Sequence, residues 1–376
     1  MNITGSVISA PVQTNFNLNH MPSYYKRIVL ASRPEGDIEP NTFRTELHPL
    51  SGLSVGDGEI LVQVTWLSLD PAMRGYLRDA RSYLPPVKIG ETMRSQGLGV
   101  VIKAGNGSSV PVGQIVAGPF GEPILLRVTL LKLAGWTEYA VMKEKQVDKI
   151  SVPKGAQDID FLNTLGMPGL TAYFGIKEIC DIKPGDKMIV SGAAGAVGSV
   201  ACQLGKRAGA KVYAIAGSKE KCEWLERELG VDRAFNYKST SFRKDLKEVG
   251  YIDVYFDNVG GDILDLILTR LNIGARIALC GAISQYNAAK PKGLQNYLTL
   301  IAMRAKIQGF IIFDYTAKFP AAIEEMAGAL ADGSLKSKFH VVEGIEQAPV
   351  ALPWLFSGKN NGKLLVKVQT EPSAKL

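Results

Sequence analysis

A glycine turn lies near the middle of this chain: Gly192-Ala193-Ala194-Gly195-Ala196-Val197-Gly198. It follows a strand-like run, Lys187–Val190, and opens a helix-like run over residues 199–208. Glycines let the backbone turn sharply and approach a pyrophosphate, and the helix N-terminus offers free N–H groups to the same anion. The next strand-like run, Lys211–Ala216, completes a β-α-β unit. Turn and context together predict a dinucleotide-binding fold.

The residues after the second strand of this unit bear on the choice of cofactor. Folds that prefer NAD place Asp or Glu there, because a carboxylate binds the ribose hydroxyls and repels a 2′-phosphate. This chain has Gly217-Ser218-Lys219-Glu220-Lys221 instead. The Ser218 hydroxyl and two ammonium groups suit a phosphate monoester, so the sequence predicts NADP(H) rather than NAD(H). The alternative is that Lys219 and Lys221 belong to a solvated helix start.

The rest of the chain divides by its pattern of strands and helices. Residues 1–20 are polar and aperiodic and are expected to form a disordered extension. Residues 21–156 show short β-like runs broken by Gly and Pro, which predict a barrel-like domain. Strands and helices alternate over residues 157–312 and predict a doubly wound parallel sheet. Residues 313–376 are expected to fold back onto the first domain.

The pattern also predicts individual elements. In the parallel sheet, the expected strands are Met188–Val190, Val212–Ala216, Val254–Phe256, Arg276–Leu279 and Gly309–Ile312. The expected helices include Lys219–Leu229 and Ile263–Leu271. The last part of the chain is expected to form helices around Pro320–Ala331 and Ala348–Phe356 and a strand, Lys363–Lys367.

Composition is that of an ordinary globular protein. The chain has 376 residues, of which 46% are hydrophobic and 21% are charged, so it is long enough for two domains with large cores. The formal net charge is +7, but basic residues alternate with acidic ones and form no long run. Solubility and attraction of an anionic cofactor explain this charge, and no nucleic-acid partner is expected.

The cysteine and histidine pattern bears on whether the protein binds a metal and on its cellular compartment. The four cysteines form no C-x-x-C pair and the three histidines are far apart, so neither a metal site nor a disulfide framework is indicated. A reduced, cytoplasmic location fits, without a signal peptide. The uncharged window Met188–Gly205 is explained by the nucleotide turn rather than by a membrane span. Ala374-Lys375-Leu376 is a variant of a peroxisomal address, which leaves that location as an alternative.

Several longer segments resemble one protein family. They are the glycine turn together with Leu67–Arg74, Gly166–Gly175, Phe235–Lys238, Tyr255–Gly261 and Cys280–Ser284. From about residue 25 to 368 the chain resembles the zinc-independent medium-chain dehydrogenases/reductases. Within them it is most similar to the branch of prostaglandin and leukotriene reductases, plant alkenal double-bond reductases and bacterial curcumin reductase.

The resemblance implies an α/β protein in which a GroES-like β-barrel domain, split in sequence (21–156 and 313–376), packs against a Rossmann domain (157–312). NADP(H) and a small enone or enal are then expected to bind in the cleft between the domains, and a homodimer is expected. The resemblance places the pyrophosphate against Gly195, Ala196, Val197 and Gly198, and the 2′-phosphate against Lys221 and Tyr237. The remaining cofactor contacts that it implies are Asn258, Cys280, Gly281, Ala282, Ile283, Ser284, Phe310, Ile311, Ile312 and Asn360.

The chain departs from relatives of this family at two places. The catalytic Cys and His and the four-cysteine lobe of zinc-dependent relatives have no counterpart, and no Cys precedes Cys180, so no zinc is expected. Between Phe120 and Gly135 the chain inserts an apolar stretch, Pro123–Leu131. This stretch is either an extra loop or an artefact of the gene model.

The mechanism implied by the family is reduction of the C=C bond of an α,β-unsaturated ketone or aldehyde. Hydride leaves the nicotinamide for the β-carbon, a hydrogen-bond donor stabilises the enolate oxygen, and a proton reaches the α-carbon. Tyr286 is the candidate donor, because a phenol with an ordinary pKa near 10 stays protonated at neutral pH. Alternatively, Tyr286 only contacts cofactor or bridges its loop, and the cofactor ribose supplies the hydrogen bond. Tyr83 and Arg74 are lesser candidates for pocket walls.

Two other functions remain open from the sequence. A quinone reductase would use the same fold and cofactor on bulkier substrates. A non-catalytic NADPH-binding protein, structural or RNA-binding, would retain the cofactor motifs without turnover. The unbroken glycine turn and complete set of motifs favour an enzyme over the second alternative. The physiological substrate lies beyond the sequence, because pocket residues come from variable loops.

Overall fold

The computed structural model describes residues 21–118 and 135–368. The expectations for the extension at residues 1–20, the inserted stretch Pro123–Leu131 and the final tripeptide lie outside these described residues. Within them, no helix has both the length and the apolar composition needed to cross a membrane.

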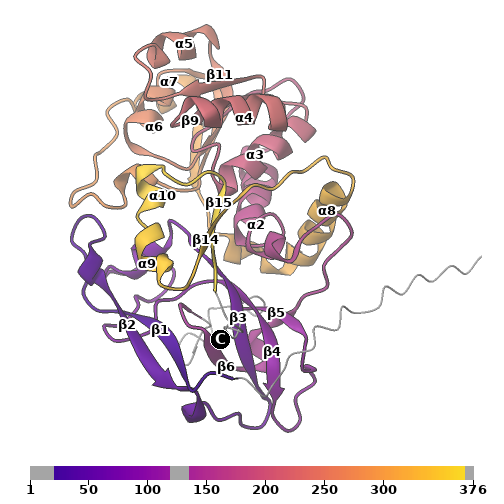
Figure 1. Ribbon diagram of the computed structural model, residues 1–376. Helices are drawn as coiled ribbons and strands as arrows, with labels where there is room; N and C mark the ends of the chain where they lie inside the picture. Colours follow the sequence, from indigo (N-terminus) through magenta and orange to yellow (C-terminus); the bar gives the residue numbers. More distant parts are fainter. Residues whose placement is uncertain (1–20, 119–134, 369–376) are drawn as a thin grey trace, which may run out of the picture.

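A six-stranded parallel sheet occupies the upper part of the molecule in Figure 1. Its strands follow the order β10-β9-β8-β11-β12-β13. Because the order reverses between β8 and β11, the sheet is doubly wound, and ligands of such sheets bind at the carboxyl ends of the strands beside this reversal. The strands are β8 (Lys187–Val190), β9 (Lys211–Ala216), β10 (Arg233–Asn236), β11 (Ile252–Asp257), β12 (Leu271–Leu279) and β13 (Lys306–Gly309).

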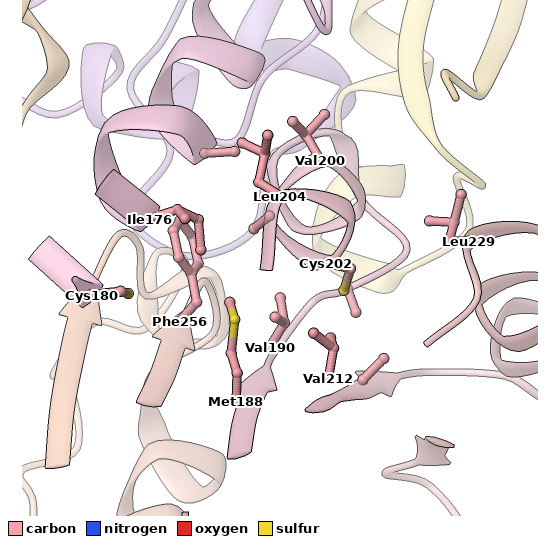
Figure 2. Packing of buried hydrophobic residues seen from close by; sticks show 14 of the residues in the cluster. Ile176, Cys180, Met188, Val190, Val200, Cys202, Leu204, Val212, Leu229 and Phe256 are labelled. Carbon is pink, nitrogen blue, oxygen red and sulfur yellow. The ribbon is translucent and has the colours of Figure 1, made fainter. Parts of the chain in front are cut away.

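Helices cover both faces of this sheet. One face is covered by α2 (Met167–Phe174), the π-helical turn η7 (Gly175–Cys180), α3 (Ala196–Arg207), α4 (Lys219–Leu229) and α8 (Phe319–Ala331), and the other by α5 (Phe242–Glu248), α6 (Gly261–Leu268) and α7 (Thr299–Met303). Figure 2 shows Met188, Val190 and Val212 of the sheet packed near Val200 and Leu204 of α3. Burying apolar side chains between layers in this way is the main source of the sheet's stability.

Three predicted boundaries in this sheet are wrong. Helix α3 begins at Ala196 rather than Ser199, so Gly198, the last glycine of the turn, already belongs to its first turn. Helix α6 ends at Leu268 because Leu271 pairs with Ile252 and opens β12. Strand β13 ends at Gly309, opposite the end of β12, so residues 310–312 follow the strand instead of forming it.

A second, seven-stranded sheet lies below the first in Figure 1. Its order is β14-β15-β3-β4-β5-β7, and β6 also pairs with β3. β1 and β2 form a separate two-stranded antiparallel ribbon, with isolated bridges from Arg27 to Thr137 and from Val29 to Thr92, two residues outside the named strands. The strands are β1 (Tyr24–Leu30), β2 (Phe43–Pro49), β3 (Glu59–Ser68), β4 (Gly97–Ala104), β5 (Ile115–Gly118), β6 (Tyr139–Lys143), β7 (Asp148–Lys149), β14 (Phe339–Glu343) and β15 (Lys363–Lys367).

The C-terminal part of the described chain returns to this sheet. β15 pairs antiparallel with the end of β3, with Leu365 opposite Ser68. The two-domain α/β fold with a split first domain is therefore confirmed, while the limits proposed for each domain stay a prediction. The helix expected over 348–356 is instead two short helices, α9 (Gln347–Ala351) and α10 (Trp354–Ser357). They separate at Pro353, which has no N–H to continue the first helix.

Candidate active site

The glycine turn joins the carboxyl end of β8 to α3. Gly192 has a φ of +57°, and a Cβ on Gly198 would lie 2.4 Å from the Gly192 carbonyl oxygen. Gly195 is the N-cap of α3, and no side chain caps the helix there. The first N–H groups of α3 therefore face outward without a side-chain acceptor, a geometry that fits a pyrophosphate. This places Gly195, Ala196, Val197 and Gly198 at the sheet edge where the sequence predicts them.

A half-buried lysine follows the second strand. Lys221 Nζ donates to the Gly358 carbonyl at 2.7 Å, and within the described residues it has no carboxylate partner. Burial and the nearby charges of Lys238 and Lys338 lower the pKa of Lys221. Ser218 caps α4 by accepting a hydrogen bond from the Lys221 N–H at 3.3 Å. A cation held among other cations fits a phosphate monoester.

The second predicted lysine does not belong to this cluster. The Lys219 side chain is 83% exposed and lies 3.8 Å from Glu223, one helical turn away. For Lys219 the solvated-helix alternative is therefore correct.

Residues from the C-terminal segment complete this cationic end of the site. His340 accepts a hydrogen bond from the Asn361 N–H at 3.2 Å. Its pKa is lowered first by burial and then by the positive charges of Lys221 and Lys359. Lys338 lies 4.4 Å above the Trp224 ring of α4. The sequence analysis missed Lys338, His340 and Lys359, because no local motif links them to a glycine turn more than 130 positions earlier.

Tyr237 and Asn360 flank this cluster. The Tyr237 ring packs so closely on Gly217 that a Cβ there would lie 3.0 Å from its Cε1. Asn360 Nδ2 donates to the Gly362 carbonyl at 2.9 Å. The Gly362 N–H in turn donates to Ala194 O of the glycine turn at 3.2 Å. The C-terminal segment is thus tied directly to the predicted pyrophosphate site.

A buried carboxylate organises the next two strand ends. Asp257, at the end of β11, accepts hydrogen bonds from the Ser191 and Tyr255 hydroxyls, both at 2.8 Å, and from the Gly260 N–H. Burial raises the pKa of Asp257. Asn258 Nδ2 donates to the Ser191 carbonyl at 2.7 Å. The sequence analysis missed Ser191 and Asp257, although a carboxylate directly after an apolar strand is a recognisable signal.

The predicted loop after β12 is held against the loop after β11. The N–H groups of Cys280 and Gly281 donate to Asp257 O, and those of Ile283 and Ser284 donate to Asn258 O and Val259 O. Ala282 lies between them. Phe310, directly after β13, meets Phe256 edge to face with ring centroids 6.4 Å apart. Ile311 and Ile312 follow it, so the structure brings these predicted segments to one edge of the sheet.

Tyr286 follows the short turn η8 (Ile283–Gln285) on the same loop. Its hydroxyl oxygen accepts a hydrogen bond from the Ala282 N–H at 3.2 Å, and burial raises its pKa. The phenol therefore stays protonated at neutral pH. Within the described residues no acceptor takes its proton, so Tyr286 can donate to a ligand.

Residues of the other domain lie near Tyr286. The Tyr83 ring lies 6.3 Å from that of Phe313 in η9 (Ile312–Lys318), and burial raises the pKa of Tyr83, with Tyr286 nearby. Lys363 Nζ, only 1% exposed, bonds to Ser68 Oγ at 2.6 Å and to Asp70 Oδ1 at 2.5 Å. The sequence analysis did not single out this buried ion pair. In residues 21–118 and 135–368, no group of three or more His, Cys, Asp or Glu is placed to hold a metal ion.

Comparisons with known proteins agree with this geometry. Residues 26–124 match the family described as the N-terminal domain of oxidoreductase, and residues 196–328 match that described as zinc-binding dehydrogenase. The chain is 38% identical over 359 residues to a putative NADP-dependent oxidoreductase of Bacillus subtilis, covering 94% of this chain and all of that relative. The chain belongs to the medium-chain dehydrogenase/reductase family.

Further members of this medium-chain family define the branch. The NADPH-dependent curcumin reductase of Escherichia coli is 34% identical over 352 residues, covering 91% of this chain and 96% of that one. The crystal structure of CurA from Vibrio vulnificus in complex with NADPH matches with a TM-score of 0.82 and 37% identity, over 92% of this chain and 100% of that chain. The family and fold predicted from the sequence are both confirmed.

Proposed function

We propose that this medium-chain dehydrogenase/reductase is an NADPH-dependent reductase of the C=C bond of α,β-unsaturated ketones and aldehydes. One observation carries the proposal: the uncapped start of α3, the half-buried Lys221, which has no carboxylate partner among the described residues, and the Tyr286 phenol all lie at the carboxyl ends of the parallel strands. The names of similar proteins support it, among them the 2-alkenal reductase of Nicotiana tabacum and the (+)-pulegone reductase of Mentha piperita.

The cofactor in this proposal is NADP(H). The free N–H groups of Ala196, Val197 and Gly198, next to Gly195, would bind the pyrophosphate, and Ser218, Lys221 and Tyr237 would bind the 2′-phosphate. The remaining contacts would come from Asn258, Cys280, Gly281, Ala282, Ile283, Ser284, Phe310, Ile311, Ile312 and Asn360. When bound, NADPH supplies a hydride from its nicotinamide.

The residue that would act on the substrate is Tyr286. Its phenol would donate a hydrogen bond to the substrate carbonyl, whose oxygen gains negative charge as hydride reaches the β-carbon. A donor aimed at developing charge contributes a few kcal/mol of transition-state stabilisation. A proton from solvent or from Tyr286 then reaches the α-carbon, so that the C=C bond gains one hydride and one proton in total.

We propose further that the reaction needs no zinc and that the protein is a homodimer. Support for the first is that the expected zinc-ligand cysteines and histidine are missing from the family motifs. Support for the second is that β13 forms the edge of the parallel sheet, and that α7 nearby exposes apolar side chains. The dimer is tested by sedimentation of the purified protein.

Four free cysteines favour the cytoplasm as the location of the protein, with the peroxisome as the alternative.

The decisive experiment follows the hydride. With NADPH deuterated at C4, reduction of an enone should place deuterium on the β-carbon of a saturated ketone, and a proton from solvent on the α-carbon. Deuterium on the carbinol carbon of an allylic alcohol would show a carbonyl reductase instead. Turnover of quinones without turnover of any enal would favour the quinone reductase alternative.

Tyr286→Phe tests the proposed donor. Removing one donor to a developing oxyanion should lower kcat about ten- to a thousand-fold while leaving the dissociation constant of NADPH nearly unchanged. Single-turnover kinetics and fluorescence titration measure the two quantities. An unchanged kcat would move the donor role to the cofactor ribose or to water.

A further inference from the structure

Two arginines of the barrel domain contact the loop that carries Tyr286. Arg74 lies in the short helix α1 (Met73–Tyr76), and Arg78 follows it by one turn. Arg78 Nη2 donates to the backbone carbonyls of Tyr286 at 2.6 Å and of Ala288 at 3.1 Å. Arg74 Nε donates to Asn287 Oδ1 at 2.9 Å. Three successive residues of the Rossmann loop are thus held by arginines from the other domain.

Arg74 is itself rigidly placed. Its side chain is 1% exposed, and Nη2 donates to the carbonyls of Pro34 at 3.0 Å and Gly36 at 2.8 Å. Asn287 Nδ2 donates to Asp37 Oδ1 at 2.7 Å, on the same barrel-domain segment. A guanidinium presents several donors in a fixed planar fork, so the bonds from Nε and Nη2 fix its orientation, although the buried Nη1 has no partner among the described residues. The loop is therefore attached to a barrel-domain framework at both its backbone and its Asn287 side chain.

The loop has little freedom at its other end. The Tyr286 hydroxyl accepts from the Ala282 N–H, and a Cβ on Gly281 would lie 3.2 Å from that hydroxyl. The position of the phenol thus depends on two sets of bonds, one inside the Rossmann loop and one from the barrel domain. Burying a guanidinium against neutral carbonyls costs desolvation free energy, so such an arrangement is weak evidence for a role in folding stability alone.

We propose that Arg74 and Arg78 are positioning residues that place the Tyr286 hydroxyl only when the two domains are packed together. We call the bonds from Arg74 and Arg78 to residues 286–288 the clamp. This inference rests on the proposed function, because it gives the clamp a role through the proposed donor. The clamp makes the reactive geometry a property of the interdomain contact rather than of the Rossmann domain alone. A displacement of about 1 Å in a positioned group is enough to lower a rate severely.

The first test uses Arg78→Ala, because Arg78 is the less buried of the two. We expect kcat for enone reduction to fall about ten- to a hundred-fold while the NADPH dissociation constant changes less than twofold. Arg78→Lys should recover only part of the rate, since an ammonium lacks the planar fork. Asn287→Ala, which leaves both arginines in place, should show the same split between kcat and cofactor affinity.

A double-mutant cycle separates positioning from general destabilisation. If Arg78 acts through the Tyr286 hydroxyl, Arg78→Ala should cost almost nothing further in a Tyr286→Phe background. The matched control is Arg270→Ala, because Arg270 Nη2 also donates to two backbone carbonyls, those of Lys247 and Gly250, but within the Rossmann domain. Its kcat should equal that of the wild type. Additive losses in the cycle would overturn the proposal.

Hydrogen exchange provides a readout that does not depend on turnover. Peptides covering residues 281–289 should exchange faster in Arg78→Ala than in the wild type, and no faster in Arg270→Ala. Unchanged exchange in these peptides would overturn the clamp even if the rate falls. Failure of the wild type to reduce any enone would instead contradict the proposed function, and exchange would still decide whether the arginines hold the loop.

Discussion

Lys219 and Lys221 lie two positions apart at the start of α4, yet their surroundings are opposite. Lys219 extends into solvent, whereas Lys221 is held at the Gly358 carbonyl among Lys238, Lys338 and His340. Sequence spacing could not separate them, because helix phase at the first turn decides which side chain faces the C-terminal segment. The sequence did identify the absence of an acid after β9, which is the observation that favours a 2′-phosphate.

Lys221→Ala should therefore change cofactor choice. We expect NADPH binding to weaken by roughly 1–3 kcal/mol, the contribution of a charge-assisted hydrogen bond, while NADH binding is nearly unchanged. Fluorescence titration with both cofactors measures this difference. Lys219→Ala is the matched control and should bind both cofactors as the wild type does. Equal wild-type affinities for NADPH and NADH would contradict the assignment.

Asp148 in β7 gives a prediction about pH. Burial raises its pKa to about 6, so the folded protein binds a proton there more tightly than the unfolded chain does. The resulting penalty is absent well below pH 4, where both states are protonated, and is complete well above pH 6. Asp148→Asn should thus stabilise the protein by about 1 kcal/mol at pH 8, after allowing for solvent screening. Urea unfolding should show this gain vanishing towards pH 4; an equal gain at both pH values would refute the cause.

At the scale of elements, the β-α-β unit was the part most fully predicted from sequence. Glycine turn, helix and second strand agree in order, and β9, α4 and β15 contain the predicted runs. The wrong predictions are at element boundaries, because the pairing of a strand with its neighbour sets where the element ends. Leu271 pairs with Ile252 and so does not belong to α6, and Gly309 ends β13 opposite the end of β12. Such limits depend on a neighbouring strand and are not encoded locally.

Gly198→Ala tests the close packing at the start of α3. A Cβ there would lie 2.4 Å from Gly192 O and 2.7 Å from Ala193 Cα, and backbone atoms cannot rotate away. We expect a loss of roughly 1–3 kcal/mol in unfolding free energy, as in other overpacked sites, and weaker NADPH binding. Gly328→Ala in α8 is the control, because nothing lies within 4 Å of its Cβ, and a helical Ala should stabilise by about 0.5–1 kcal/mol. Unchanged stability of Gly198→Ala would show that the turn can relax.

At the scale of the whole molecule, the two sheets meet through contacts that no single motif contains. The fold class was predictable because each domain has its own local pattern. The candidate site was predicted mainly on the Rossmann side, where glycines and strand ends mark it, and only Asn360, Tyr83 and Arg74 were named outside it. Lys338, His340 and Lys363, the partner of Asp70, come from the returning segment, and only the assembled structure brings them to the site.

The proposal that the reaction needs no zinc is tested on the intact protein. Activity should survive exhaustive dialysis against a chelator, since the proposed oxyanion donor is a phenol rather than a metal ion. Metal content measured on the dialysed enzyme provides the control. Stoichiometric zinc whose removal abolishes enone reduction, and whose return restores it, would disprove this part of the proposal.

The pairing of β15 with β3 has a consequence for how the protein is made. Synthesis on the ribosome delivers β3 about 300 positions before its partner strand, while all six strands of the parallel sheet emerge between these two events. Domains fold as units during synthesis, so the Rossmann sheet is complete while the earlier sheet still presents an open edge and Asp70 lacks Lys363. The first domain to begin is thus the last to finish, and a nascent chain that stops before residue 363 exposes a β-strand edge to its neighbours on the polysome.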